Sequence, residues 1–195
     1  MIKKVVLQVR ARLFRWIHKP RMLNNIYKNS NGSLAVNTRF SSTVDFINKD
    51  KIILGDNIFI WHNAILDGTG ELEIEDGCQI GANVGIFTHS SHMSIRLLGR
   101  KYSQVQGPKE EGYILKKVKI GKYSFIATGA VILPGITIGK GCIVSANSLV
   151  TKSIPDYAIV QGNPAQIIGS SDRIDKRYLN NNKELQKYYN EWNNE

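Results

Sequence analysis

Two histidines in this sequence lie close together and could take part in proton transfer. His89 and His92 belong to the stretch Ile86-Phe87-Thr88-His89-Ser90-Ser91-His92. A neutral imidazole accepts a proton from a hydroxyl or an amine near neutral pH. The sequence offers no convincing pair of a nucleophile and a neighbouring base. We therefore predict that His89 or His92 acts as a general base.

Metal binding is the alternative use of the same pair. A zinc site needs three protein ligands, and His62 is the only obvious third candidate. The fourth histidine, His18, lies in a basic N-terminal segment and is expected to be structural or solvated. We favour the general base and predict no metal site.

The two histidines lie where a regular repeat is interrupted, and this repeat decides the fold. Between residues 120 and 150 an aliphatic residue returns at every sixth position. A period of six matches neither an α-helix nor a single strand. It predicts one short strand and one corner per repeat, with three repeats in each coil of an all-β, triangular parallel helix. The aliphatic positions are Ile120, Ile126, Ile132, Ile138, Val144 and Val150.

The same rhythm is present upstream in interrupted form. It breaks at Asp67-Gly68-Thr69-Gly70 and resumes in a new phase, which predicts about two coils in 54–91 and two more in 118–153. Residues 92–117 lack the period and carry eight charged residues. A loop of this length is usually functional or disordered. We predict an arm that projects from one corner over a neighbouring subunit. The upstream aliphatic positions are Leu54, Ile60, Leu66, Ile74, Ile80 and Ile86.

Positive charge is concentrated at the N-terminus. Residues 1–30 contain eight lysines or arginines and no acid, so the rest of the chain holds only +2 of the net charge of +10. Between residues 5 and 17, apolar and basic residues alternate in a loosely amphipathic pattern. Such a helix either rests on an anionic membrane surface or caps the open end of the β-helix. Nucleic acid is not an expected partner, because the repeats show no basic stripe with interleaved aromatics.

The remaining features complete the domain plan. No apolar stretch is long enough to span a membrane, and the first residues do not resemble a signal peptide. A cytoplasmic protein is expected, in contact with the inner face of the membrane if residues 1–30 bind there. Residues 31–169 are expected to form the β-helix, and residues 170–195 a helical tail docked on it or on a neighbour. Cys78 and Cys142 occupy small-residue positions of the repeat and are predicted to be buried fillers.

Several motifs together resemble the hexapeptide-repeat acetyltransferases over residues 53–169. The resemblance is strongest to the branch that acetylates maltose, galactosides and capsule or O-antigen sugars. The family implies a left-handed β-helix, a handedness that residue spacing does not give. The motifs are residues 81–89, residues 121–139 with Ile132-Leu133-Pro134-Gly135, residues 150–155, and Gly162-Asn163-Pro164-Ala165.

The resemblance also implies a homotrimer with acetyl-CoA, as co-substrate, in the groove between adjacent subunits, and no permanently bound cofactor. Thr128 and Gly129 match residues near the thioester, and Ala146 matches one whose backbone meets the pantetheine arm. Small residues let an extended pantetheine approach main-chain groups. Thr151 and Lys152 match the pair near the adenosine 3′-phosphate, where a lysine supplies positive charge.

The acceptor side of the family's site is matched less fully. His62 and Asn63 align near acceptor-contacting positions of the sugar enzymes. Where members often carry an arginine or lysine after the Asn-Pro-Ala motif, this chain has Gln166. His89 fits members with a Thr-His pair just before the projecting loop, whereas His92 fits members with a longer offset. We prefer His89.

The expected function is therefore that of an acetyl-CoA-dependent O-acetyltransferase acting on a sugar hydroxyl of a cell-surface polysaccharide precursor. The histidine removes the hydroxyl proton, and the acetyl group passes directly within a ternary complex. Backbone N–H groups near Thr128 and Gly129 are expected to meet the oxyanion. One alternative is N-acetylation of a nucleotide-linked amino sugar. Another is a zinc protein like the gamma-class carbonic anhydrases, which share the prism and bind zinc through three histidines between subunits.

Overall fold

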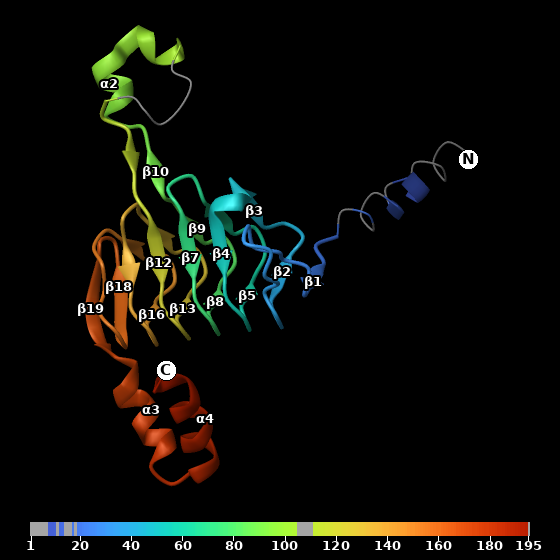
Figure 1. Cartoon of the computed structure of the whole chain (residues 1–195), viewed down its shortest axis with the longest axis vertical. Coiled ribbons are helices and arrows are strands. Elements are labelled where there is room, and N and C mark those ends of the chain that lie inside the picture. Colours follow the sequence, from blue (N-terminus) through green and yellow to red (C-terminus); the bar gives the residue numbers. More distant parts are fainter. Residues whose placement is uncertain (1–7, 11, 14–16, 18, 105–110, 195) are drawn as a thin grey trace.

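The computed structural model describes residues 8–10, 12–13, 17, 19–104 and 111–194. Its body is a β-helix whose short strands form three flat faces, which we name by their strand number (Figure 1). The eight-stranded face contains β1 (Met22–Asn24), β2 (Arg39–Ser41), β5 (Phe59–Ile60), β8 (Gln79–Ile80), β13 (Phe125–Ile126), β16 (Ile143–Val144), β18 (Ala158–Gly162) and β19 (Ala165–Ser170). The five-stranded face contains β3 (Asp45–Ile47), β6 (Ile65–Asp67), β9 (Gly85–Ile86), β14 (Val131–Ile132) and β17 (Leu149–Val150). The four-stranded face contains β4 (Ile52–Leu54), β7 (Leu72–Ile74), β12 (Val118–Ile120) and β15 (Thr137–Ile138).

The six-residue repeat produces this fold because each aliphatic repeat position points to the axis of the prism. Parallel pairing places Ile120 beside Ile138 and Ile126 beside Val144, so equivalent side chains stack from coil to coil. All six aliphatic repeat positions between 120 and 150 are at most 1% exposed. Their stacking buries apolar surface continuously along the axis, which stabilises the short parallel strands.

The β-helix begins one coil earlier than the repeat count indicates. β2, β3 and β4 form a complete coil, so the count of about four coils was too low. Phe40 pairs with Ile60 and Phe46 with Leu66, so both phenylalanines occupy repeat positions. Two extra residues before Leu54 then shift the phase. Because of the aromatic residues and the shift, this coil does not show aliphatic residues at a spacing of six.

The interruptions of the repeat all fall at one corner. We call it the second corner; it lies between the five-stranded and four-stranded faces. In the first three coils the chain there makes the 3-10 helix η1 (Lys49–Lys51), a turn at 67–71, and the long arm between β9 and β12. The first corner, between the eight-stranded and five-stranded faces, keeps a short turn at 61–64, 81–84, 127–130 and 145–148. Because successive coils stack, the three insertions of the second corner lie one above another.

The arm begins earlier than the expected residue 92. At its base β10 (His89–Ser90) and β11 (Ile114–Leu115) pair antiparallel, with His89 opposite Leu115. Beyond them lie α2 (Ser94–Leu98) and η2 (Gly99–Gln104), which stand away from the β-helix in Figure 1. His89 therefore lies at the base of the arm, in the antiparallel strand pair that connects the arm to the second corner.

The helical tail packs on the third corner, between the four-stranded and eight-stranded faces. β19 turns back antiparallel to β18, and α3 (Ser171–Leu179) and α4 (Lys183–Asn193) follow. Trp192 of α4 stacks on Tyr123 with ring centroids 4.5 Å apart. None of the described helices is long and apolar enough to cross a membrane. The tail lies against the β-helix of its own chain, on the side away from the arm (Figure 1).

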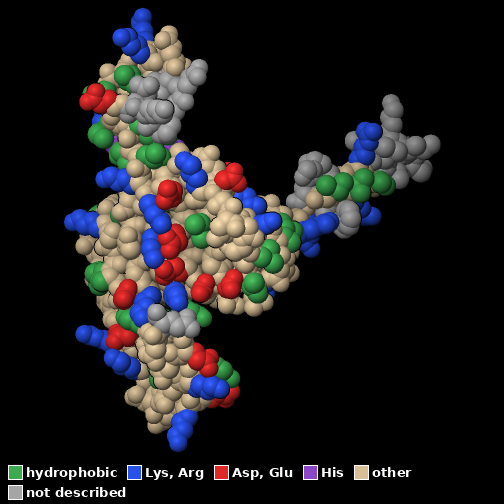
Figure 2. All heavy atoms as spheres, in the orientation of Figure 1, with side chains coloured by type: hydrophobic (Ala, Val, Ile, Leu, Met, Phe, Trp, Pro, Cys, Tyr) green, Lys and Arg blue, Asp and Glu red, His purple; other side chains and the backbone are tan. Residues whose placement is uncertain are grey.

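The outer surfaces of the faces differ in chemistry. On the four-stranded face Glu73 pairs with Lys117 at 2.5 Å and with Lys119 at 3.2 Å. Figure 2 shows acidic and basic side chains side by side in the middle of the molecule, over this face. The five-stranded face instead carries the aliphatic residues Ile65, Val131 and Leu149 at the outward positions of β6, β14 and β17.

Candidate active site at the second corner

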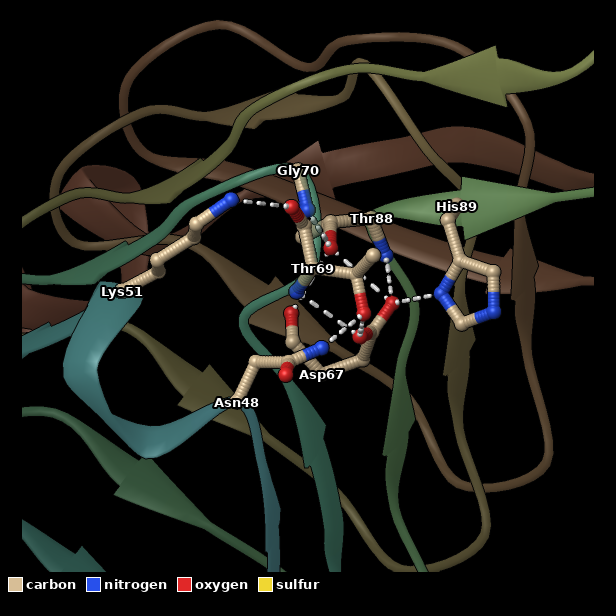
Figure 3. A network of polar contacts seen from close by, with 7 residues as sticks. All are labelled: Asn48, Lys51, Asp67, Thr69, Gly70, Thr88 and His89. Atoms are coloured by element: carbon tan, nitrogen blue, oxygen red, sulfur yellow. Dashed lines mark hydrogen bonds and ion pairs between the residues drawn. The ribbon is translucent and has the colours of Figure 1, made fainter. Parts of the chain in front are cut away.

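The stacked insertions of the second corner enclose a small polar cluster (Figure 3). Leu66 fills a repeat position inside the prism, and the next residue, Asp67, starts the turn with none of its surface exposed. One coil further on, Thr88 is equally buried where the arm departs. A buried carboxylate is costly unless hydrogen-bond donors surround it. The turn and the base of the arm supply those donors.

Asp67 accepts hydrogen bonds through both of its carboxylate oxygens. Oδ1 accepts from the N–H of Thr69 at 2.9 Å and from its hydroxyl at 2.5 Å. Oδ2 accepts from the N–H of Thr88 at 2.8 Å and from Nδ1 of His89 at 2.6 Å. Burial alone would raise the pKa of Asp67, but these hydrogen bonds outweigh it and lower the pKa to about 2. The carboxylate is therefore ionised at neutral pH.

This carboxylate holds His89 in one orientation. Because an ionised carboxylate only accepts hydrogen bonds, Nδ1 of His89 carries the ring hydrogen and Nε2 carries the lone pair. Figure 3 shows Nε2 pointing away from Asp67, and 32% of the His89 side chain is exposed. The Tyr113 ring lies parallel to the imidazole, with centroids 5.9 Å apart and 6° between the planes. The arrangement presents a basic nitrogen to an incoming hydroxyl, which is what a general base requires.

The other candidate histidines have different surroundings. His92 is exposed, and its Nδ1 lies 2.7 Å from the Ser90 hydroxyl. His62 lies at the first corner, with its Nδ1 2.6 Å from the Ser41 hydroxyl. Within the described ranges, neither ring pairs with a carboxylate. The structure thus keeps His62 apart from His89, at a different corner of the prism.

The residues expected near the thioester and the pantetheine share the first corner. Thr128, Gly129 and Ala146 lie in the same column as His62 and Asn63, two to three coils further along the axis. Main-chain hydrogen bonds join the turns at 61–64, 81–84, 127–130 and 145–148 into this column. Thr128 and Ala146 are exposed. The column therefore offers main-chain groups to a ligand that runs along the prism.

A cavity of about 350 Å³ opens beside Thr128 on the eight-stranded face. A Cβ atom at Gly81 would lie only 2.6 Å from the Thr128 nitrogen, so the glycine leaves that N–H uncovered. The N–H of Thr128 has no acceptor among the described residues, whereas the N–H of Gly129 donates to the Ala82 carbonyl. Of the two candidates for an oxyanion donor, only Thr128 is thus free to act. The walls of the cavity are Phe59, Trp61, Gln79, Ile80, Gly81, Ala82, Phe125 and Thr128.

The expected phosphate-binding pair lies on the same corner as the histidine. Thr151 and Lys152 follow β17 at the second corner, two coils beyond His89, and both are exposed. Thr128 and Ala146 lie at the first corner, across the five-stranded face. One protomer therefore places the base and the lysine at one edge of this face and the thioester residues at the opposite edge.

Nucleophilic chemistry by cysteine does not fit this molecule. Cys78 and Cys142 are fully buried at small-residue positions of the repeat, which confirms that prediction. Burial raises the pKa of Cys78 to about 12 and that of Cys142 to about 11, whereas reactive cysteines have a lowered pKa. Among the residues that the structure describes, no three His, Cys, Asp or Glu side chains are placed to hold a metal ion. The geometry of the cluster supports proton transfer at His89.

Sequence reasoning overlooked Asp67, Thr88 and Tyr113. A signal for Asp67 was present, because an acid directly follows the inward Leu66 where the repeat breaks. The sequence marks Thr88 only as the residue before His89. Tyr113 gave no signal, because it lies in the aperiodic arm and reaches the imidazole only through the β10–β11 pairing.

Two family models match the coils of the β-helix. Residues 117–152 match the bacterial transferase hexapeptide model of six repeats, and residues 71–90 match the hexapeptide repeat of succinyl-transferase. Among curated relatives, a galactoside O-acetyltransferase from Lactococcus lactis subsp. lactis is 30% identical over 115 residues, which cover 58% of this chain and 50% of the relative. The matched region covers 55% of a putative acetyltransferase from Saccharomyces cerevisiae and 70% of one from Staphylococcus aureus.

Solved structures agree with the family models. A maltose O-acetyltransferase from Clostridium difficile 630 is 31% identical with a TM-score of 0.57, over 66% of this chain and 64% of that one. A hexapeptide-repeat acetyltransferase from Vibrio cholerae is 30% identical with a TM-score of 0.58, over 67% and 69% of the two chains. The Vibrio protein has also been solved in complex with acetyl-CoA. These matches confirm the left-handed β-helix.

Proposed function

The chain belongs to the hexapeptide-repeat acetyltransferase family, and from this premise we propose that it transfers an acetyl group from acetyl-CoA to a sugar hydroxyl. The observation that carries the proposal is the His89 imidazole, whose Nε2 is turned outward by the buried, ionised Asp67. Support for the donor comes from the Vibrio relative bound to acetyl-CoA, and support for a sugar acceptor from the Clostridium relative named for maltose. The acceptor we propose is a cell-surface polysaccharide precursor.

In the proposed reaction, Nε2 of His89 takes the proton of the acceptor hydroxyl while the hydroxyl oxygen attacks the thioester carbonyl carbon. The Asp67 carboxylate stabilises the imidazolium through the Nδ1 hydrogen bond. The N–H of Thr128 donates to the tetrahedral oxyanion, a contribution of ~3 kcal/mol at such a position. Collapse breaks the carbon–sulfur bond, and the CoA thiolate leaves with the proton from His89. Donor and acceptor are bound together, so no acyl-enzyme forms.

The proposed site is complete only in an assembly, and we propose a homotrimer. Because a cyclic assembly repeats one contact around its axis, the second corner of each protomer can meet the first corner of the next. His89 and Lys152 of one subunit then face Thr128 and Ala146 of its neighbour across the groove that holds acetyl-CoA. The aliphatic outer surface of the five-stranded face lies between these corners and suits a buried interface.

The trimer can be tested with one substitution and a matched control. Ile65→Arg places a charge on the five-stranded face and is expected to give monomers that lack activity, although His89 and Asp67 remain intact. Ile53→Arg changes an isoleucine of similar exposure on the four-stranded face, 45% against 36%, and should leave a trimer. Light scattering coupled to size exclusion measures both. A wild-type monomer at micromolar concentration, or an active Ile65→Arg monomer, would contradict the proposal that two subunits form the site.

Lys152 is proposed to bind the adenosine 3′-phosphate, and its replacement should separate binding from chemistry. Lys152→Ala is expected to raise KM for acetyl-CoA severalfold with little change in kcat, because the phosphate is remote from the reacting carbonyl. Lys183→Ala, an exposed lysine at the start of α4, should leave both constants unchanged. Equal KM values for acetyl-CoA and its 3′-dephospho form in the wild-type protein would show that no residue reads this phosphate.

The acceptor class is tested by a product analysis. Purified protein is incubated with acetyl-CoA and a panel of mono- and oligosaccharides, and acetylated products are identified by mass spectrometry. An ester, which neutral hydroxylamine cleaves, supports O-acetylation; an amide, which resists hydroxylamine, would instead assign N-acetylation of an amino sugar.

We place the reaction in the cytoplasm, because that compartment supplies acetyl-CoA. His62 and Asn63 are proposed to contact the acceptor.

A further inference from the structure

The end of the β-helix is closed by Tyr27, which lies near the C-terminal end of the basic segment 1–30. The Tyr27 ring is 1% exposed and packs on Phe40 and Phe46, with centroids 6.1 and 5.2 Å away. Its hydroxyl donates to the Ile52 carbonyl at 3.1 Å, and the Lys49 ammonium lies 4.7 Å from the ring centroid. The cap that was one of the two predicted roles of residues 5–17 is therefore supplied by Tyr27 and its neighbours.

The described part of the segment presents an apolar stripe to solvent. Residues 8–10, 12–13 and 17 have helical backbone, and the other residues from 1 to 18 lie outside the described part of the chain. Val9, Leu13 and Ile17 follow one another at intervals of four, which places them on one side of a helix. They are 57, 54 and 55% exposed. Figure 1 shows the described residues of this stretch, in dark blue, standing clear of the β-helix.

Charge indicates which surface the stripe fits. Residues 1–30 carry eight lysines or arginines and no acid, and Arg10 and Arg12 are exposed beside the stripe. An anionic bilayer satisfies both features, because its acyl boundary accepts apolar side chains and its lipid phosphates attract cations. Nucleic acid would satisfy the charges alone. The rest of the chain has a net charge of +2, so a second copy of the β-helix has no net negative charge that would attract the segment.

We propose that the described residues of this segment bind the surface of an anionic membrane, with Val9, Leu13 and Ile17 facing the acyl chains and Arg10 and Arg12 facing lipid phosphates. In the proposed trimer, the three helices leave the same end of the assembly, because cyclic symmetry keeps the prisms parallel. Three weak attachments then combine into a stronger one. This arrangement holds the enzyme at the surface where a lipid-linked glycan would be presented.

The test uses full-length protein and two kinds of vesicle, one of phosphatidylcholine alone and one that also contains phosphatidylglycerol. The protein is expected to co-sediment with the anionic vesicles at low salt and to be released at high salt, as the Debye length falls from ~10 Å at 0.1 M to ~3 Å at 1 M. Leu13→Asn combined with Ile17→Asn should weaken the partition coefficient at least about tenfold. Arg10→Gln and Arg12→Gln should weaken it about fivefold each.

The matched control is Leu34→Asn combined with Ile167→Asn, which removes two aliphatic side chains that are 49 and 58% exposed outside the segment. This pair should bind vesicles like the wild type. Wild-type protein that stays in the supernatant, equal binding to both vesicle types, or an unaffected Leu13 and Ile17 variant would overturn the proposal. Acetylation of a soluble sugar is expected to be the same in all variants. Loss of vesicle binding with acetylation intact therefore leaves the proposed enzyme activity standing.

Discussion

Replacing His89 by alanine is expected to lower kcat by about 10²–10⁴, the usual contribution of a positioned general base. The acceptor hydroxyl would lose its proton only to water, while the groups proposed to hold acetyl-CoA remain in place. Initial rates of CoA release give kcat, and calorimetric titration with acetyl-CoA gives the affinity, which should stay within a small factor of the wild-type value.

His92→Ala is the matched control, because it removes an exposed imidazole three residues away that has no carboxylate partner in the described structure. It should retain nearly all activity. An inactive His92→Ala variant beside an active His89→Ala variant would transfer the role of base to His92. Full activity in both variants would show that neither histidine acts as the general base.

Replacing Asp67 by asparagine should have the second-largest effect, again about 10²–10⁴ on kcat, with the upper end set by the corresponding change in a Ser-His-Asp triad. The amide can donate a hydrogen bond to Nδ1, which moves the ring hydrogen of His89 to Nε2 and removes the basic atom from the acceptor side. KM for acetyl-CoA should change little, because Asp67 acts through His89.

The stability of the Asp67→Asn variant supplies a second readout, with a defined dependence on pH. The folded pKa of Asp67, about 2, lies below its ordinary value of 3.8. The ionised carboxylate therefore stabilises the fold above that ordinary value, and this stabilisation disappears as the pH falls through about 2. The Tm of the wild type should exceed that of the variant most at neutral pH, and the two should converge in acid.

Thr69→Val is the control for Asp67. It removes the hydroxyl bond to Oδ1 but leaves Oδ2 in contact with His89. Its Tm should fall while kcat is retained. A loss of kcat as large as that of Asp67→Asn would contradict a positioning role exerted through Oδ2.

The fold could be predicted where the repeat is regular, because one inward aliphatic residue per six defines both strand and corner. From Ile120 to Val150 no residue is inserted, and every inward position is buried as expected. The repeat did not predict the first coil, because Phe40 and Phe46 occupy its inward positions and an insertion precedes Leu54. Spacing carries no information where an insertion resets it.

The site could be predicted only in its parts. The break in the repeat pointed to His89, but the hydrogen bond to Asp67 depends on two insertions, one coil apart, being stacked at the same corner. In the structure, His89 and Lys152 lie at the second corner of the prism, whereas Thr128 and Ala146 lie at the first corner. A list of matched residues does not reveal that separation, because it appears only when the coils are laid over one another.

Calorimetric titration of the assembled wild-type protein with acetyl-CoA tests whether neighbouring subunits share an acetyl-CoA site, and it requires no knowledge of the acceptor. We expect saturable binding of one acetyl-CoA per protomer, retained in His89→Ala and lost in the monomeric Ile65→Arg variant. Ala146→Trp, which fills the first corner beside the proposed pantetheine path, should also lose binding while remaining a trimer. A folded wild-type protein that does not bind acetyl-CoA, or an Ile65→Arg monomer that binds it normally, would show that no such shared site exists.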